Sequence, residues 1–243
     1  MIRPTALFVL LMIWAPQAPA FTQQATHAIT GASFALTSGD TVRLSGIDTP
    51  QEEPARQALE KLVAGQTLRI TQVTKNIDRH GRMLAHAYLE DGRLIEAELL
   101  KQGLAVINDF TYQRSDALEE MLDSERAARK AKRGIWQQQC CRVLAPGETP
   151  NYLNQFRLVE GVIESTSLFH GHFYIHFSRY WKGSFTVFIS GKVLAHERTQ
   201  EDFAALLAKL KEGKTVCIRG WIRDHKGSPN IEITSPNQIE VEN

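Results

Sequence analysis

Charged side chains with complementary chemistry stand close together in the stretch VRLSGIDTPQEEP, residues 42–54. Arg43 lies five residues before Asp48, a Thr-Pro turn follows the aspartate, and two glutamates come after the turn. A guanidinium is permanently charged and fits phosphate oxygens in a fork. Carboxylates can hold a cation or accept a proton from water. The spacing is what a phosphate-cleaving site can look like, although the residue directly after the proline is the neutral Gln51.

The elements that must position these groups alternate between short strands and helices. Strands joined by glycine-containing turns are predicted over residues 26–47, and two more flank the turn DRHG at residues 78–81. Helices are predicted to open at Pro54 and end at Gly65, to cover residues 95–103, and to run from Ser115 to Arg133. This pattern predicts an α+β first domain that is mainly β.

The remainder of the chain has a second pattern. Residues 157–234 are predicted to form three strands, a helix and two strands. That is the order of the five-stranded Greek-key barrel called the OB-fold. We therefore predict a second, small OB-like barrel, which by itself names no ligand.

Composition places the boundaries between these parts. Residues 1–20 combine one cation, Arg3, with a short apolar run and a small-residue Ala-Pro-Ala end, which is typical of a signal peptide. A run of about ten residues is short of the ~20 that span a bilayer, so a retained anchor is the less favoured alternative. We predict export to the periplasm or the medium, and no integral span after cleavage. The predicted divisions are the signal peptide 1–20, a first domain 21–139, a linker 140–152 and an OB-fold-like domain 153–243.

The net charge of the chain is +1, so nothing draws the whole protein toward nucleic acid. A nucleic-acid interface must therefore rest on local patches, against the simpler interpretation of solvated surface. The candidates in the basic segment RAARKAKR and in the second domain are Lys130, Lys132, Arg133, Trp181 and Lys182.

The three cysteines are Cys140, Cys141 and Cys217. An odd number leaves open whether one of the adjacent pair bonds Cys217. No Cys-x-x-Cys spacing supports a metal site.

Three separated motifs carry a resemblance to a known family. They are VRLSGIDTP, DRHGRMLAHAYLEDGRLIEAELLKQGLAVI and RAARKAKRGIW. In this order they resemble the staphylococcal nuclease (thermonuclease) family over about residues 27–137. The resemblance implies a five-stranded OB-type barrel wrapped by three helices, and a calcium-dependent phosphodiesterase site that cuts DNA or RNA.

The resemblance also implies roles for individual residues. Arg43 and Arg82 correspond to the two arginines that bind the phosphate and stabilise the transition state. Asp48 corresponds to a calcium-binding aspartate, and Thr49 to the residue whose backbone carbonyl binds the metal. The alternative for the charged residues is a solvated rim of the barrel with an Arg43–Asp48 ion pair.

Two positions depart from the family's pattern. Ala32 stands where the family has a second calcium-binding aspartate, and Gln51 stands where it has the glutamate that acts on the attacking water. Glutamine cannot take a proton at neutral pH, and losing such a base typically costs about 10²–10⁴ in rate. Losing a carboxylate also weakens calcium binding. Glu52 or Glu53 could substitute if its carboxylate reaches the site.

The sequence therefore supports three hypotheses. The first is an exported thermonuclease-like protein with a degenerate calcium and general-base site, which binds nucleic acid or another phosphate-bearing ligand and cleaves weakly or not at all. The second is an active calcium-dependent endonuclease of DNA or RNA that uses Arg43, Arg82, Asp48 and Glu52 or Glu53. The third is an envelope module that binds a protein partner and keeps only a vestigial site.

Overall fold

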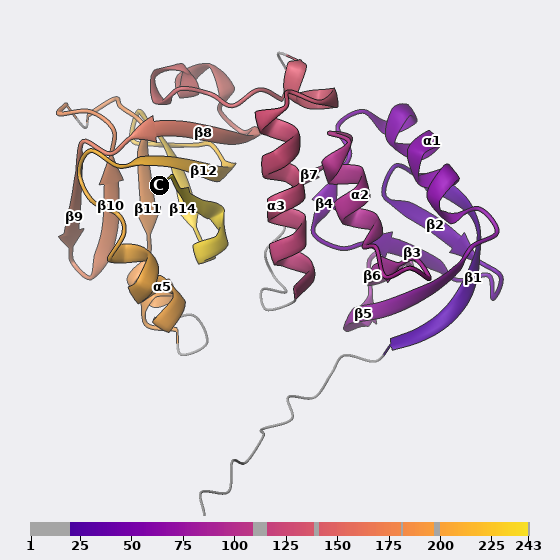
Figure 1. Ribbon diagram of the computed structural model, residues 1–243. Coiled ribbons are helices and arrows are strands. Elements are labelled where there is room, and N and C mark those ends of the chain that lie inside the picture. Colours follow the sequence, from indigo (N-terminus) through magenta and orange to yellow (C-terminus); the bar gives the residue numbers. More distant parts are fainter. Residues whose placement is uncertain (1–19, 109–115, 139–140, 181, 197–199, 243) are drawn as a thin grey trace, which may run out of the picture.

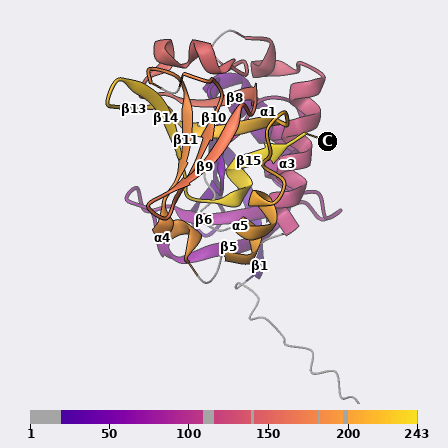
Figure 2. The same ribbon diagram turned by 90° about the vertical axis from the view of Figure 1, so that its left-hand side faces the viewer.

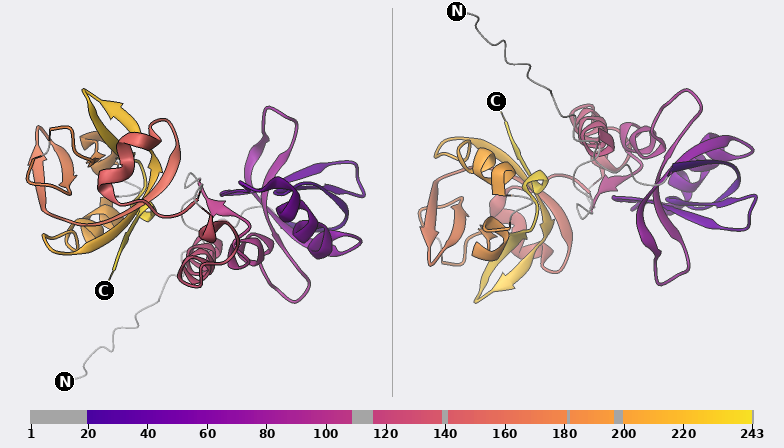
Figure 3. Two further views of the ribbon diagram at one scale, coloured as in Figure 1. Left: turned by 90° about the horizontal axis from the view of Figure 1, so that it is seen from above. Right: turned by 90° about the horizontal axis from the view of Figure 1, so that it is seen from below.

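The computed structural model describes residues 20–108, 116–138, 141–180, 182–196 and 200–242. An N-terminal barrel and a C-terminal pair of sheets lie on opposite sides of helix α3 (Asp116–Lys130) (Figure 1, Figure 3). Two hydrophobic clusters fill the two parts, and a third, which includes Ala128, Trp136 and Leu158, packs between them.

The N-terminal part is a closed five-stranded barrel, as the resemblance implied. The strand order is β1-β2-β3-β6-β5, and β3 pairs with β6 in parallel while the other neighbours are antiparallel. The strands are β1 (Ala20–Thr30), β2 (Ser33–Leu36), β3 (Thr41–Leu44), β5 (Thr67–Ile77) and β6 (Met83–Tyr88).

Alternation along β3 sets the direction of Arg43. Val42 and Leu44 are buried in the barrel core, whereas Arg43 between them is partly exposed. Successive side chains of a strand point to opposite faces, so burial of the two apolar neighbours directs Arg43 outward. The parallel register pairs Val42 with Met83, which brings Arg82, the residue before Met83, alongside the start of β3.

The predicted strand over residues 40–47 is interrupted in the structure. β3 ends at Leu44, Gly46 has φ +77°, and β4 (Ile47–Asp48) is a separate strand. Positive φ is cheap only for glycine, so the chain turns there and leaves the barrel wall. β4 then pairs with β7 (Val106–Ile107) in a two-stranded sheet of its own.

Helix α1 (Glu52–Val63) begins two residues before Pro54, where the sequence had placed its start. Proline fits the first turn of a helix because the first backbone N–H groups have no intrahelical acceptor. Gly65, with φ +70°, follows the end of the helix as predicted. α1 packs very closely on the barrel, because a Cβ on Gly31 would lie 2.7 Å from that of Ala55.

Two further helices complete this part and agree with the predicted pattern. They are α2 (Ile95–Lys101) and α3, which is followed by a short 3-10 helix η1 (Gly134–Gln137). The residue at which α3 was predicted to begin, Ser115, lies outside the described residues.

The C-terminal part contains two sheets, with orders β13-β14-β11-β10-β9 and β15-β12-β8. Its strands are β8 (Phe156–Val162), β9 (Ser165–Phe169), β10 (His172–His176), β11 (Thr186–Ile189), β12 (Thr215–Trp221), β13 (Arg223–His225), β14 (Ser228–Ile233) and β15 (Ile239–Val241). The helices are η2 (Pro146–Tyr152), α4 (Gly191–Leu194), α5 (Gln200–Leu207) and η3 (Pro236–Gln238).

The prediction of a second closed barrel is wrong for the described residues, because these two sheets do not close (Figure 2). Two predicted long strands are each divided between the sheets. The chain bends after β8 at Ile163 and after β12 at Ile222, and both isoleucines are buried in the core. The two bends divide the five predicted strands into seven, and β15 is an additional strand beyond them.

The segment predicted as a linker is folded where the structure describes it. Leu144 is buried in the C-terminal core, and Pro146–Tyr152 forms the 3-10 helix η2. The division of the chain into domains stays a prediction. Among the described residues, no helix has both the length and the apolar composition needed to cross a membrane.

Candidate functional site

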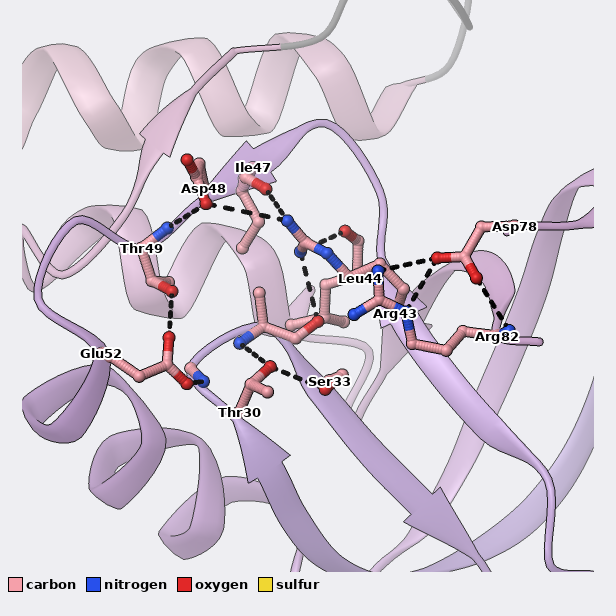
Figure 4. A network of polar contacts seen from close by, with 12 residues as sticks. Thr30, Ser33, Arg43, Leu44, Ile47, Asp48, Thr49, Glu52, Asp78 and Arg82 are labelled. Atoms are coloured by element: carbon pink, nitrogen blue, oxygen red, sulfur yellow. Dashed lines mark hydrogen bonds and ion pairs between the residues drawn. The ribbon is translucent and has the colours of Figure 1, made fainter. Parts of the chain in front are cut away.

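The guanidinium of Arg43 is held by backbone carbonyl groups at the mouth of the barrel (Figure 4). Nη1 donates to the carbonyl oxygens of Ala32 at 3.3 Å and Leu44 at 3.0 Å, and Nη2 donates to that of Ile47 at 2.8 Å. These carbonyls belong to the turns that end β1 and β3. Arg43 therefore holds both turns in place, and the same hydrogen bonds fix the plane of its guanidinium.

Asp48 lies beside this guanidinium without closing on it. Its Oδ1 is 3.9 Å from Arg43 Nη2 and accepts a hydrogen bond from the backbone of Thr49 at 3.0 Å. The Asp48 side chain is 60% exposed, against 19% for Arg43. Burial lowers the pKa of Arg43, nearby Asp48 opposes this shift, and the like charge of Arg82 adds to it. Arginine keeps its charge in proteins. Arg82 is therefore a second cation near Arg43.

That second cation, Arg82, is oriented by Asp78. Arg82 Nε donates to Asp78 Oδ2 at 2.8 Å, and its backbone N–H donates to Oδ1 at 3.0 Å. The pKa of Asp78 is lowered to about 2. Burial acts in the opposite direction, but hydrogen bonds from Arg82 and from the backbone of His80 outweigh it. Sequence reasoning missed Asp78, although it begins the DRHG turn that was singled out, and an aspartate commonly accepts bonds from the following backbone in such turns.

Gln51 is engaged away from the two arginines. Its side-chain nitrogen donates to Oε1 of Gln138, the residue after η1. Its backbone carbonyl accepts from the backbone N–H of Ala55 at 3.2 Å. The side chain thus connects the start of α1 to a segment 87 residues later. The amide nitrogen is therefore used in a structural contact.

The two glutamates after the turn point in different directions. Glu52 Oε1 accepts from the backbone of Gly31 at 2.7 Å, and Oε2 accepts from Thr49 Oγ1 at 3.2 Å. Glu53 instead binds Arg56 and Gln57 on the surface, and these hydrogen bonds lower the pKa of Glu53 to about 2. Glu52 therefore faces the site (Figure 4), whereas Glu53 is paired with Arg56 and Gln57 on the exposed surface of α1.

A family model described as "Staphylococcal nuclease homologue" matches residues 41–138. These residues form a domain of the staphylococcal nuclease family. The match contains Arg43, Asp48 and Arg82 and confirms the resemblance found in the motifs. We call residues 41–138 the nuclease-family domain, although β1 and β2 of its barrel precede the match.

Relatives that match the chain are named endonucleases. An "Uncharacterized endonuclease" of Escherichia coli O157:H7 is 31% identical over 100 residues, which is 39% of this chain and 61% of the relative. The "SPbeta prophage-derived endonuclease YokF" of Bacillus subtilis (strain 168) is 28% identical over 109 residues, which is 40% of this chain and 36% of that protein. The chain thus spans about three fifths or less of the length of these relatives.

The residues around the site do not fit the calcium ion that the family implies. Ala32 is buried, has no side-chain oxygen, and lies outside the family match. Both oxygens of Glu52 already accept hydrogen bonds, which leaves Asp48 as the exposed carboxylate of the expected set. Calcium takes six to eight oxygen ligands and prefers several anionic ones. No group of three or more His, Cys, Asp or Glu side chains suited to a metal occurs in the described part of the chain.

The predicted basic patch is only partly available. Lys130, Lys132 and Arg133 are exposed, as the prediction required, but Arg126 and Arg129 of the same segment bind Glu240 of the C-terminal part. In the second domain Lys182 is exposed in a turn, while Trp181 lies outside the described residues.

The two described cysteines, Cys141 and Cys217, lie in the hydrophobic cluster between the two parts. Cys217 is buried and its Sγ lies 3.0 Å from Arg129 Nη1, while Cys140 lies outside the described residues. Burial raises the pKa of the Cys217 thiol to about 11. Cys141 and Cys217, the two cysteines that the structure describes, form no disulfide with each other.

The Asp78–Arg82 pair predicts a specific acid titration. The Asp78 carboxyl is expected to titrate at about 2, against an ordinary 3.8. Because the folded value is lower, the ionised carboxyl stabilises the fold above pH 3.8, and this contribution is lost as the pH falls from 3.8 through about 2. Carboxyl ¹³C shifts followed by NMR during a pH titration measure the value. In Arg82→Met the pKa should return toward 3.8, and an unchanged titration there would show that Arg82 is not the cause.

Proposed function

We propose that the Arg43–Arg82 site binds the phosphodiester backbone of a nucleic acid and cleaves it weakly or not at all. The observation that carries this proposal is that the position after the proline holds a neutral amide, Gln51, whose nitrogen donates to Gln138, so no basic group stands there. The endonuclease names of the relatives support nucleic acid as the ligand class.

Binding is supported by two guanidinium groups on adjoining parts of the barrel wall. Arg43 is fixed by three carbonyls and Arg82 by Asp78, so little side-chain entropy is lost when a phosphate binds. Asp48, Asp78 and Glu52 offset this positive charge, however. We therefore expect a Kd in the range of non-specific binding, about 10⁻⁴–10⁻⁶ M at physiological salt.

Weak cleavage is supported by the chemistry of the site. Hydrolysis of a phosphodiester needs a water that loses a proton as it attacks, and a positioned base contributes about 10²–10⁴ in rate. Gln51 is neutral and already hydrogen-bonded, and Ala32 supplies no carboxylate. Neither arginine replaces these functions, because a guanidinium has no acceptor.

A second candidate function is slow hydrolysis with Glu52 as the proton acceptor. The observation that favours it is the contact of Glu52 with Thr49 Oγ1, one residue from Asp48. In this candidate Arg43 and Arg82 hold the phosphate, and the Glu52 carboxylate accepts the proton of a water beside Asp48. The hydrogen bond from the backbone N–H of Gly31 orients the Glu52 carboxylate.

We also propose that the C-terminal part is an OB-like fold. β11 lies parallel to β14, β8 pairs with β12, and each of β8 and β12 continues into a strand of the other sheet. This is the strand order of an OB barrel that is opened at two bends.

Export stays part of this proposal. It rests on the cation and apolar run of residues 1–20, of which only residue 20 is described. N-terminal sequencing of the protein from the periplasm or medium would test cleavage after Ala20.

Arg82→Met is expected to weaken oligonucleotide binding. Removing one phosphate contact should raise Kd about tenfold and lower the slope of log K against log salt by about 0.7 for a single strand. Fluorescence anisotropy with a labelled oligonucleotide at several salt concentrations measures both. Arg93→Met is the matched control, because Arg93 binds Asp91 in a similar turn elsewhere on the domain. Equal losses of oligonucleotide affinity in the two variants would contradict the assignment of the site.

The double variant Ala32→Asp/Gln51→Glu is expected to cleave DNA at least about 10²-fold faster than the parent, because it restores the missing base and carboxylate. Plasmid and single-stranded DNA digestion with and without calcium measures the gain. Gln51→Glu alone covers the case in which a charge at buried position 32 destabilises the fold. A parent chain that already digests DNA as fast as the double variant would contradict weak cleavage.

Glu52→Gln distinguishes the second candidate. If Glu52 accepts the proton, any slow cleavage by the parent should fall by about 10²-fold or more. Glu53→Gln should leave it unchanged, because Glu53 is paired with Arg56 and Gln57 on the exposed surface of α1. Slow cleavage that survives Glu52→Gln would exclude Glu52 as the acceptor.

A further inference from the structure

A fully buried ion pair joins the C-terminal part to the nuclease-family domain. Arg219 of β12 places Nη1 2.6 Å from Oε2 of Glu125 in α3, and both side chains are 0% exposed. Arg219 also binds Glu240 of β15. Charges removed from water in this way must be paired, because an uncompensated buried charge is strongly unfavourable.

The other oxygen of Glu125 reaches the strand next to the candidate site. Glu125 Oε1 accepts from the backbone N–H of Ile107 in β7 at 2.8 Å. Ile107 faces Ile47 of β4, and the adjacent ladder bond runs from the N–H of Asn108 to the carbonyl of Gly46 at 3.0 Å. The N–H of Ile107 thus points away from β4 and toward α3, where the carboxylate satisfies it.

Arg43 occupies the opposite edge of the same ladder. The carbonyl of Ile47 accepts from Arg43 Nη2, and Asp48 is the next residue of β4. The ladder comprises only two residue pairs, so its own backbone bonds are few. Charged side chains therefore hold both of its edges, Glu125 on the β7 side and Arg43 on the β4 side.

We propose that Arg219 is a positioning residue for the phosphate-binding site, although it lies in the C-terminal part. Arg219 holds the Glu125 carboxylate in place, and Glu125 fixes β7. The β4–β7 ladder in turn fixes the carbonyl that orients Arg43 and the backbone that carries Asp48. This inference rests on the proposed function only for the ligand that Arg43 binds. The coupling of Arg219 to the β4–β7 ladder through Glu125 does not depend on which ligand binds.

A neighbouring residue provides a matched control. Arg129 also crosses from α3 to the C-terminal part, where it binds Glu240 at 2.6 Å and Cys217 at 3.0 Å. Its side chain is 11% exposed. These hydrogen bonds and ion pairs end in the C-terminal sheets, and Arg129 acts on Glu125, the acceptor of Ile107, only through its charge at a distance. Arg129→Met should therefore weaken the junction without releasing the ladder.

The test uses full-length Arg219→Met, Glu125→Gln, the double variant and Arg129→Met. Amide hydrogen exchange at Ile107 and Asn108 is measured at a temperature well below each melting temperature, together with oligonucleotide Kd. In Arg219→Met we expect exchange at Ile107 to rise, and Kd to rise, each about tenfold. The double variant should recover both to within about threefold, because the amide oxygen introduced by Glu125→Gln still accepts from Ile107 and no unpaired charge remains.

Arg129→Met should lower the melting temperature but leave exchange at Ile107 and Kd at the parent values. Equal changes in Arg129→Met and Arg219→Met would overturn the proposal, because they would indicate general weakening of the junction. Unchanged exchange at Ile107 in a folded Arg219→Met would also overturn it. If the parent binds no oligonucleotide, the proposed function fails, and exchange at Ile107 in the four variants still decides the coupling.

Discussion

The bonds from Arg43 to three backbone carbonyls are the constraint on which the site depends. They connect the turn after β1, the end of β3 and the start of β4 through one rigid, charged group. A lysine offers its donors at one point and cannot make this set, since only the planar fork spans separated acceptors. The residue that would bind a phosphate is therefore also the residue that builds the mouth of the barrel. The presence of Arg43 is therefore explained by its role in the fold, and it is not by itself evidence of catalysis.

Local patterns in the sequence were sufficient to predict most strands of the barrel, because apolar and polar residues alternate along them and glycine marks the turns. The strand that carries Arg43 was predicted, and the burial of Val42 and Leu44 on either side explains why the arginine points outward. The pattern failed where the chain turns between alternating residues, as at Gly46, and where buried Ile163 and Ile222 bend the C-terminal strands. An apolar residue at a bend has the same appearance in a sequence as one in a continuous strand.

The candidate site was predictable to the extent that its residues are close in sequence. The matched segment contains Arg43, Asp48 and Arg82, and the structure brings Arg82 to β3 through the parallel β3–β6 register. The directions of Glu52 and Glu53 could not be predicted, because adjacent residues at a helix start choose their partners from the surrounding fold. The partner of Gln51 is distant for the same reason, and no local pattern identifies such a pair.

The charges around the two guanidinium groups bear on cation binding and on anion binding alike. Arg43 and Arg82 face three carboxylates, those of Asp48, Asp78 and Glu52. In the family, the resemblance implies, a bound cation would offset such carboxylates and leave the arginines available to the phosphate. With Ala32 in place of an aspartate, the carboxylates are offset chiefly by the arginines and by backbone N–H groups. An incoming phosphodiester must compete with these internal partners for the arginines, so the carboxylates that orient the guanidinium groups also limit how strongly the site can bind an anion.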